Sequence, residues 1–127
     1  MRSIREMIVN LNCKNFLECF YGLNESDEEV FRCLVEFGEA RIDDLSNALN
    51  KSENSIYRSL QKLLMAGLVI RDKRLIESGG YYYTYKPVDL NSMIKEMHKT
   101  IDIWYTKIKN LIDEFASEFK ARIAVRE

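Results

Sequence analysis

The C-terminal third of the chain carries an apolar pattern that one small domain cannot bury. Eight apolar residues recur alternately four and three positions apart between residues 90 and 115, which is the heptad pattern of a coiled-coil helix. At roughly 1.5 Å per residue, this seam is about 38 Å long. We therefore expect a second copy of the chain to cover it in a homodimer. The seam residues are Leu90, Ile94, Met97, Ile101, Trp104, Ile108, Leu111 and Phe115.

The heptad pattern changes after Phe115. The next seam position is Glu118, and the apolar residues move to Phe119 and Ile123. Either the coil changes its register at this point or the coil ends there. We assign residues 89–127 to a C-terminal coiled-coil helix.

The N-terminal segment also has helical spacing of apolar residues, and Gly22 ends it. A helix is predicted over residues 3–21, and residues 1–22 are expected to contribute to the dimer interface. The apolar residues are Ile4, Met7, Ile8, Leu11, Phe16, Leu17 and Phe20.

Three further helices are predicted between residues 24 and 66. The first begins at Asn24, or at Ser26 with Glu29 as a capping box, and ends at Gly38. The short second helix is capped by Asp43. The third is capped by Ser52, after a turn at residues 50–51. Gly67 suits the left-handed C-cap of the third helix. The inward residues are predicted to be Val30, Phe31, Leu34, Val35 and Phe37, then Leu45, Ala48 and Leu49, then Ile56, Leu60, Leu63 and Leu64.

Two strand-like runs, LVIRDKRLI and YYYTYKP, flank residues 77–80. Gly79 and Gly80 can adopt the positive φ angles of a hairpin turn, and Pro87 closes the second strand because it cannot donate to a ladder. The fold class is therefore mainly α with a small β-hairpin wing: a winged helix-turn-helix over residues 23–88, followed by a long C-terminal dimerisation helix.

The charge of the chain is concentrated in its middle third. The formal net charge is −1 overall, whereas residues 51–86 contain seven Lys and Arg against three Asp and Glu. A basic segment in an otherwise neutral chain indicates a local anionic partner.

Residues 22–71 resemble the DNA-binding domain of archaeal TrmB-type regulators, which are related in form to the MarR type. The resemblance is carried by Phe37-Gly38-Glu39-Ala40 before the second helix, Ser52 at the start of the third, Ile56-Tyr57-Arg58 within it and Gly67-Leu68-Val69 after it. It implies a transcriptional regulator that binds double-stranded DNA. Larger family members carry a C-terminal sugar-binding domain, where this chain has only a helix, so we expect a short regulator without sugar sensing.

The third helix and the hairpin supply the candidate DNA-binding residues. Arginine can pair with guanine, and Asn or Gln with adenine, whereas Ser52 and Lys51 are better placed for phosphates. The alternatives are a merely solvated polar face and, on the hairpin, charges that prevent sheet pairing. The candidates are Lys51, Ser52, Asn54, Ser55, Tyr57, Arg58, Gln61, Lys62, Arg71, Lys73 and Arg74.

Four of the seven tyrosines lie in the second strand of the hairpin. Because side chains alternate along a strand, only one set can face the core. We expect Tyr83 and Tyr85 to pack against the third helix, and Tyr81 and Tyr82 to lie near the exposed tip. A base-stacking platform is the less favoured alternative, since it usually needs an open sheet.

Catalytic, metal-binding and membrane-spanning patterns are missing from the sequence. No apolar run is long enough to cross a bilayer, and the N-terminus lacks the apolar core of a signal peptide. Cys13, Cys19 and Cys33 form no CxxC pair, and His98 is the only histidine. Free thiols are favoured over a redox sensor. We expect a cytoplasmic, nucleoid-associated protein without cofactor or metal that is not an enzyme.

The sequence thus predicts a homodimeric, sequence-dependent regulator of transcription whose partners are double-stranded DNA and a second copy of the chain, with no membrane partner. Repression by occluding a promoter is expected, and an effector is not identified. Two alternatives remain: an architectural, chromatin-like DNA-binding protein of the same fold, and a winged-helix protein-interaction module that does not bind DNA.

Overall fold

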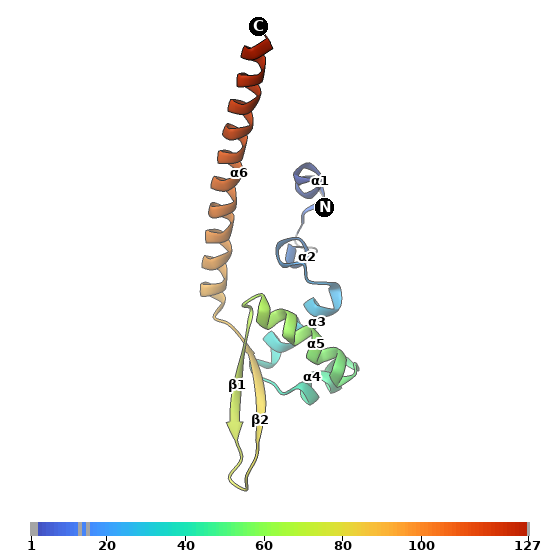
Figure 1. Ribbon diagram of the computed structural model, residues 1–127. Coiled ribbons are helices and arrows are strands. Elements are labelled where there is room, and N and C mark those ends of the chain that lie inside the picture. Colours follow the sequence, from blue (N-terminus) through green and yellow to red (C-terminus); the bar gives the residue numbers. More distant parts are fainter. Residues whose placement is uncertain (1–2, 13, 15, 127) are drawn as a thin grey trace. The chain divides into compact units, whose positions relative to one another are not determined.

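A computed structural model describes residues 3–12, 14 and 16–126. It confirms a mainly helical fold with one antiparallel β-hairpin and a long C-terminal helix (Figure 1). The chain divides into two units between Val88 and Asp89. The first contains α1 (Ile4–Asn10), α2 (Phe16–Tyr21), α3 (Glu25–Phe37), α4 (Ile42–Leu49), α5 (Glu53–Met65), β1 (Val69–Leu75) and β2 (Tyr81–Pro87), and the second contains α6 (Leu90–Arg126).

The expected single helix over residues 3–21 is wrong, because the described residues form two short helices. Leu11 leaves the helical conformation, with φ −69° and ψ 129°, and α2 begins only at Phe16. The side chain of Asn12 accepts a hydrogen bond from the Lys14 N–H at 2.8 Å. Asparagine side chains compete in this way with helical hydrogen bonds, which explains the break.

Helix α3 begins with a reciprocal capping box. The Asn24 side chain accepts from the Asp27 N–H at 2.8 Å, and the Asp27 carboxylate accepts from the Asn24 N–H at 3.0 Å. Of the two predicted caps, Asn24 is therefore correct and Ser26 is not. Val35 and Phe37 were expected inward but are 51% and 49% exposed, since Val35 lies about a quarter turn from the buried stripe and Phe37 is the last helical residue.

Helix α4 begins two residues earlier than predicted. Arg41 is its N-cap residue, and the Asp44 carboxylate accepts a hydrogen bond from the Arg41 N–H at 2.9 Å. Asp43 is therefore not the cap. Of the three residues predicted to face inward, Leu45 is buried and Leu49 is half-buried, whereas Ala48 is exposed, contrary to expectation. Ile42 is also half-buried.

The hairpin register places Arg71 opposite Tyr85, Lys73 opposite Tyr83 and Leu75 opposite Tyr81. An isolated bridge joins the base of β2 to the chain before α4: the Ala40 N–H donates to the Tyr85 carbonyl at 2.9 Å, and the Tyr85 N–H donates to the Ala40 carbonyl at 2.8 Å. Strand β1 contacts α5, and β2 contacts α3. Each strand of the hairpin is thus packed against one of the helices.

One apolar core holds α3, α4, α5 and the base of the hairpin together. Its members are at most 4% exposed, and burying each large side chain contributes about 1.5–3 kcal/mol relative to leaving it in water. The core includes Leu23, Val30, Leu34, Leu45, Ile56, Leu60, Leu63, Leu68, Val69 and Tyr85.

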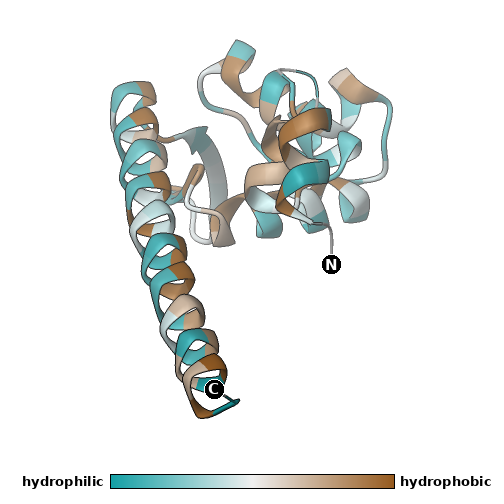
Figure 2. Cartoon of the chain, turned by 90° about the horizontal axis from the view of Figure 1, so that it is seen from above, coloured by the Kyte–Doolittle hydropathy of each residue, from teal (hydrophilic) through white to brown (hydrophobic). Residues whose placement is uncertain are grey.

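Helix α6 is one uninterrupted helix of 37 residues, and none of them is buried. Apolar residues recur along its length, as the brown segments in Figure 2 show. The helix does not end at Phe115: the rings of Phe115 and Phe119 lie 4.4 Å apart, and Ile123 follows one turn later. Phe115, Phe119 and Ile123 are spaced four residues apart, whereas the heptad pattern alternates spacings of four and three. The apolar stripe therefore changes its register after Phe115.

Candidate nucleic-acid interface

The turn between α4 and α5 fixes where α5 begins. Asn50 adopts the left-handed conformation with φ 53°, which ends α4 and reverses the chain. The Ser46 hydroxyl donates to the Lys51 carbonyl. The Ser52 side chain then accepts from the Ser55 N–H at 3.1 Å, so Ser52 is the N-cap as predicted.

Helix α5 has one buried face and one polar, exposed edge. Ile56, Leu60 and Leu63 are completely buried, and Leu64 is half-buried. The exposed edge carries Ser52, Asn54, Tyr57 and Arg58. Among the described residues, no carboxylate lies within ion-pairing distance of Arg58. This edge offers hydroxyl, amide, phenol and guanidinium groups to a polar partner.

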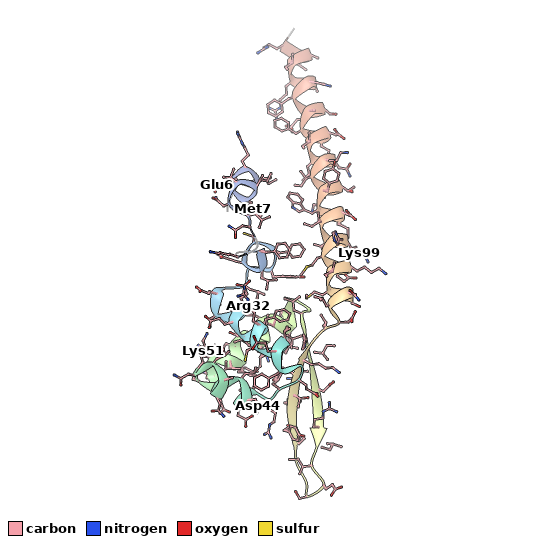
Figure 3. The ribbon with its side chains drawn as sticks, turned by 180° about the vertical axis from the view of Figure 1, so that it is seen from behind. Glu6, Met7, Arg32, Asp44, Lys51 and Lys99 are labelled. Atoms are coloured by element: carbon pink, nitrogen blue, oxygen red, sulfur yellow. The ribbon has the colours of Figure 1, made fainter. Side chains whose placement is uncertain are left out.

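Two of the predicted cationic contacts are instead engaged with α3. The Lys51 ammonium, labelled in Figure 3, lies 2.9 Å from the Glu29 carboxylate and donates to the Ser26 hydroxyl at 2.7 Å. The Lys62 ammonium lies 3.1 Å from the Asp27 carboxylate. Lys51 therefore ties the turn before α5 to α3, and Lys62 ties α5 itself to α3. A direct role in DNA contact for either of them stays a prediction.

Gln61 and Ser55 are half-buried rather than fully outward. The Gln61 side-chain nitrogen is buried without a hydrogen-bond partner among the residues that the structure describes. The residues predicted to face outward on α5 thus include two, Ser55 and Gln61, that are not fully exposed.

Asp27 is the buried charge that joins α3 to α5. The carboxylate is 1% exposed and accepts from the Ser59 hydroxyl at 2.7 Å in addition to Lys62 and the Asn24 N–H. Burial on its own raises the pKa of this carboxyl, but the hydrogen bonds and the Lys62 charge outweigh burial, and its pKa lies below the ordinary value. Asp27 is therefore ionised at neutral pH.

One face of the hairpin stacks cations on aromatic rings. The Arg71 guanidinium lies 4.3 Å from the centre of the Tyr83 ring, and the Lys73 ammonium lies 4.1 Å from that of Tyr81. The Tyr81 and Tyr83 rings pack edge to face, with 5.5 Å between centroids. No carboxylate of the described residues pairs with Arg71 or Lys73. We call this set, Arg71, Lys73, Tyr81, Tyr83 and Tyr85, the cation–ring face.

The opposite face of the hairpin neutralises its own charges. Arg74 lies 2.6 Å from the Glu39 carboxylate and 4.0 Å from that of Asp72, and Lys86 lies 3.4 Å from Asp72. The Thr84 hydroxyl also donates to Glu39 at 2.8 Å. The hydrogen bond from Arg74 lowers the pKa of Glu39, and Glu39 in turn raises the pKa of Arg74. Arg74 is thus separated from Arg71 and Lys73, with which it was grouped.

Tyr85 ends the cation–ring face inside the core, where it is 1% exposed. Burial raises the pKa of its hydroxyl, and the positive charge of the neighbouring Arg71 guanidinium opposes part of the rise. The prediction that Tyr85 is inward is confirmed. Tyr83 is half-buried, and its packing against α5 stays a prediction.

The sequence pattern did not find Arg41, Glu39 or the ring contacts. The Arg41 guanidinium lies 4.5 Å from the centre of the Tyr82 ring, on the side of the hairpin that carries Arg74. The alternation of β2 indicated which tyrosines share a face. Pairing each cation with a ring additionally requires the strand register, which the residue pattern alone leaves open.

The predicted seam residues lie on α6 with their side chains largely uncovered. Trp104 is 44% exposed, Leu111 47% and Phe115 61%. Met97 and Ile108 are half-buried. A helix with such a stripe gains hydrophobic free energy only when another surface covers it.

The described part of the chain contains neither a helix that could cross a bilayer nor three His, Cys, Asp or Glu side chains grouped to hold a metal ion. Cys33 is buried and Cys19 half-buried, both as free thiols, and Cys13 lies outside the described residues. Burial, with a smaller contribution from Glu36, raises the pKa of the Cys33 thiol, so it is a poor nucleophile.

Comparison with known proteins identifies the family. The family model described as sugar-specific transcriptional regulator TrmB matches residues 17–91, more than half of the chain. An uncharacterized protein of Methanocaldococcus jannaschii, MJ1503, is 30% identical over 104 residues, which are 82% of this chain and 79% of that protein.

Solved structures show the same fold. A possible transcriptional regulator from Methanosarcina mazei superposes with a TM-score of 0.71 at 22% identity, covering 82% of this chain and 88% of the other. The MarR family transcription regulator SP03579 superposes with a TM-score of 0.50 at 17% identity, covering 96% of this chain and 82% of the other. The family and the fold are those of transcriptional regulators rather than of enzymes. The chain belongs to the TrmB family of transcriptional regulators.

Proposed function

We propose that the protein is a homodimeric repressor that binds double-stranded DNA in a sequence-dependent way. The observation that carries this proposal is the coexistence of two unneutralised polar surfaces in one unit: the exposed edge of α5 and the cation–ring face of the hairpin. In a winged helix-turn-helix, the helix after the turn enters the major groove and the wing reaches the adjacent backbone or minor groove.

The side chains on the edge of α5 have the chemistry that base reading requires. A guanidinium can donate two hydrogen bonds to guanine O6 and N7, and a carboxamide can pair with adenine N6 and N7. Arg58 and Asn54 are exposed and can take these roles, while Ser52 lies at the helix N-terminus, where the free N–H groups favour phosphate. Arg71 and Lys73 would then bind phosphates or enter a narrow minor groove.

The uncovered stripe of α6 supports pairing of two copies. Like seams on two identical helices are complementary by symmetry, and a coiled coil buries both at once. A two-fold dimer would present two copies of α5 to half-sites about one helical turn apart or a multiple of that distance. Occupation of such a site within a promoter excludes polymerase, which is the proposed route to repression.

An arginine pair tests the DNA-binding proposal. Arg58→Ala should weaken binding to a duplex selected from a random pool by about 5- to 150-fold, because a good bidentate contact to a base is worth about 1–3 kcal/mol. Arg32→Ala is the matched control, since Arg32 is an exposed arginine on α3 that pairs only with Glu28 at 3.7 Å in the described part of the chain. Its affinity should stay within twofold. Fluorescence anisotropy titrations at a fixed salt concentration provide the measurement.

The same titrations separate the alternatives. Equal affinity for selected and scrambled duplexes, with a steep salt dependence for both, would indicate an architectural protein. No binding of the wild-type protein in dilute buffer would favour a protein-interaction module. In vitro transcription from a promoter containing the selected site should decrease as protein is added, and an increase at every protein level would contradict repression.

A further inference from the structure

The two free cations of the hairpin are each supported by a tyrosine one step closer to the tip. Arg71 is paired across the ladder with Tyr85, yet its guanidinium lies over the ring of Tyr83 at 4.3 Å. Lys73 is paired with Tyr83, yet its ammonium lies over the ring of Tyr81 at 4.1 Å. Both cations therefore use the diagonal neighbour on the same face, which long side chains can reach in an antiparallel ladder.

The rings that support these cations are themselves fixed in a chain of contacts. Tyr81 and Tyr83 pack edge to face at 5.5 Å, and Tyr85 is buried and held by two backbone hydrogen bonds to Ala40. The row of rings thus begins in the core at Tyr85 and continues along β2 toward the tip of the hairpin.

The other face of the hairpin provides an internal contrast. There, Arg74 pairs with the Glu39 carboxylate and Lys86 with that of Asp72, and these ion pairs neutralise both cations. A ring holds a cation without neutralising it, because the ring carries a quadrupole and no net charge. Arg71 and Lys73 are therefore held in place and still available to an anion.

We propose that Tyr83 and Tyr81 are positioning residues that hold Arg71 and Lys73 ready for DNA, so that the cation–ring face is the nucleic-acid side of the wing and the Arg74 side is its brace. This inference rests on the proposed DNA-binding function. Holding a long side chain in its bound orientation before association reduces the conformational entropy that binding would otherwise remove.

A double-mutant cycle between Tyr83 and Arg71 tests the proposal. Tyr83→Ala should weaken duplex binding by about 2- to 10-fold in the wild-type background, which corresponds to immobilising one long side chain. The same change should have almost no further effect in an Arg71→Ala background, because the side chain to be positioned is missing. Equal losses in both backgrounds would overturn the proposal while DNA binding stands.

Salt dependence distinguishes positioning from contact. Arg71→Ala should reduce the slope of log affinity against log salt by about one, because one phosphate contact is lost. Tyr83→Ala should leave that slope unchanged, since the cation remains. A slope that falls equally in both variants would contradict a positioning role.

Conservative variants separate the ring from its packing. Tyr83→Phe keeps the aromatic face and should retain affinity within twofold, whereas Tyr83→Leu keeps apolar bulk without a π face and should resemble Tyr83→Ala. Wild-type affinity in Tyr83→Leu would show that packing alone matters. Tyr82→Ala is the matched control, because its ring supports Arg41 at 4.5 Å on the other face. It should show no coupling to Arg71.

A measurement without DNA makes the two proposals separable. In the absence of DNA, NMR relaxation of the Arg71 side-chain Nε–H should show restricted motion in the wild-type protein and less restricted motion in Tyr83→Ala. Unrestricted motion in the wild-type protein would overturn the positioning role, whatever the DNA result. Restricted motion together with no duplex binding at low salt would overturn both the proposed function and the assignment of the cation–ring face to DNA.

Discussion

The two units of the chain solve the burial of apolar residues in opposite ways. Residues of α3, α4, α5 and the hairpin surround a common core with side chains that are completely removed from water, such as Leu34, Leu45 and Leu60. Helix α6 is nearly three times as long as α3 or α5, and none of its residues is buried. Within the first unit, the part from α3 to β2 contains the partners for the apolar residues of its core, whereas α1 and α2, like α6, bury none of theirs. An apolar stripe of this kind gains hydrophobic free energy only when another surface covers it.

Ion pairs between different elements are found in the first unit but not in the described part of the second. In the first unit, Lys62 on α5 pairs with Asp27 on α3, and Lys51 in the turn before α5 pairs with Glu29 on α3, in addition to the Arg32–Glu28 pair within α3. In the described part of α6, the ion pair is Arg122 with Glu118, one turn apart on the same helix. Pairs between helices fix tertiary structure, whereas a pair within one helix supports that helix only.

The largest expected effect is on the proposed pairing of α6 with a second copy of the chain. Trp104→Glu would place a carboxylate without a partner on each side of the seam. A buried charge without a partner typically costs about 3–5 kcal/mol. We expect a stable dimer to become a monomer at micromolar concentration in sedimentation velocity. The apolar-to-acidic control is Ile103→Glu, because Ile103 is 61% exposed and lies off the seam. A Trp104→Glu protein that remains dimeric would show that the seam is not the interface.

The next effect is confined to the first unit. Leu60 is completely buried in the core, and Leu60→Ala should lower the free energy of unfolding by about 2–5 kcal/mol. Met65→Ala, on the same helix at 89% exposure, should change it by less than about 0.5 kcal/mol. Urea denaturation measures both changes. Similar losses in the two variants would contradict the assignment of a single core.

The smallest effect concerns the charge shared by α3 and α5. Asp27→Asn removes the charge that pairs with Lys62 and should cost about 1–3 kcal/mol of stability at pH 7. Because the folded pKa of Asp27 lies below the unfolded value, its contribution is present above about pH 4 and is lost as the pH falls through the folded pKa. The wild-type protein should therefore approach the stability of Asp27→Asn in acid.

The control for this change is Asp43→Asn, since Asp43 is an exposed carboxylate that pairs with Arg41 at 3.5 Å. It should leave both the stability at pH 7 and its acid dependence nearly unchanged. A constant difference between wild type and Asp27→Asn across the acid range would contradict a lowered pKa for Asp27. Denaturation curves recorded between pH 2 and pH 7 supply the data.

Local signals in the sequence were sufficient for most element boundaries. Ser52, Gly38 and Gly67 carry their cap geometry in their own chemistry, and each lies where a helix begins or ends. The seam of α6 follows from spacing alone. Asn24 was not separable from Ser26 as a cap, because the choice depends on Asp27 reaching back to the Asn24 N–H.

Long-range pairing explains what sequence reasoning missed at the candidate interface. Lys51, Lys62 and Arg74 look like free cations in a basic segment, but their carboxylate partners lie on or beside α3, 22 to 35 residues earlier in the chain. Neither periodicity nor local charge indicates where the end of a long flexible side chain lies. The support of Arg71 by Tyr83 was hidden for a related reason, since it depends on the hairpin register.

The register of the hairpin makes its chemistry a matter of odd and even positions. Arg71 and Lys73 share one side with the odd-numbered tyrosines, and Asp72 and Arg74 share the other with Thr84 and Lys86. A single-residue insertion within β1 would exchange the two sides while leaving composition and net charge almost untouched. This strand should therefore tolerate many substitutions more readily than a change in its length. Among length changes, the insertion or deletion of two residues should disturb it least, because each side chain then stays on its own face.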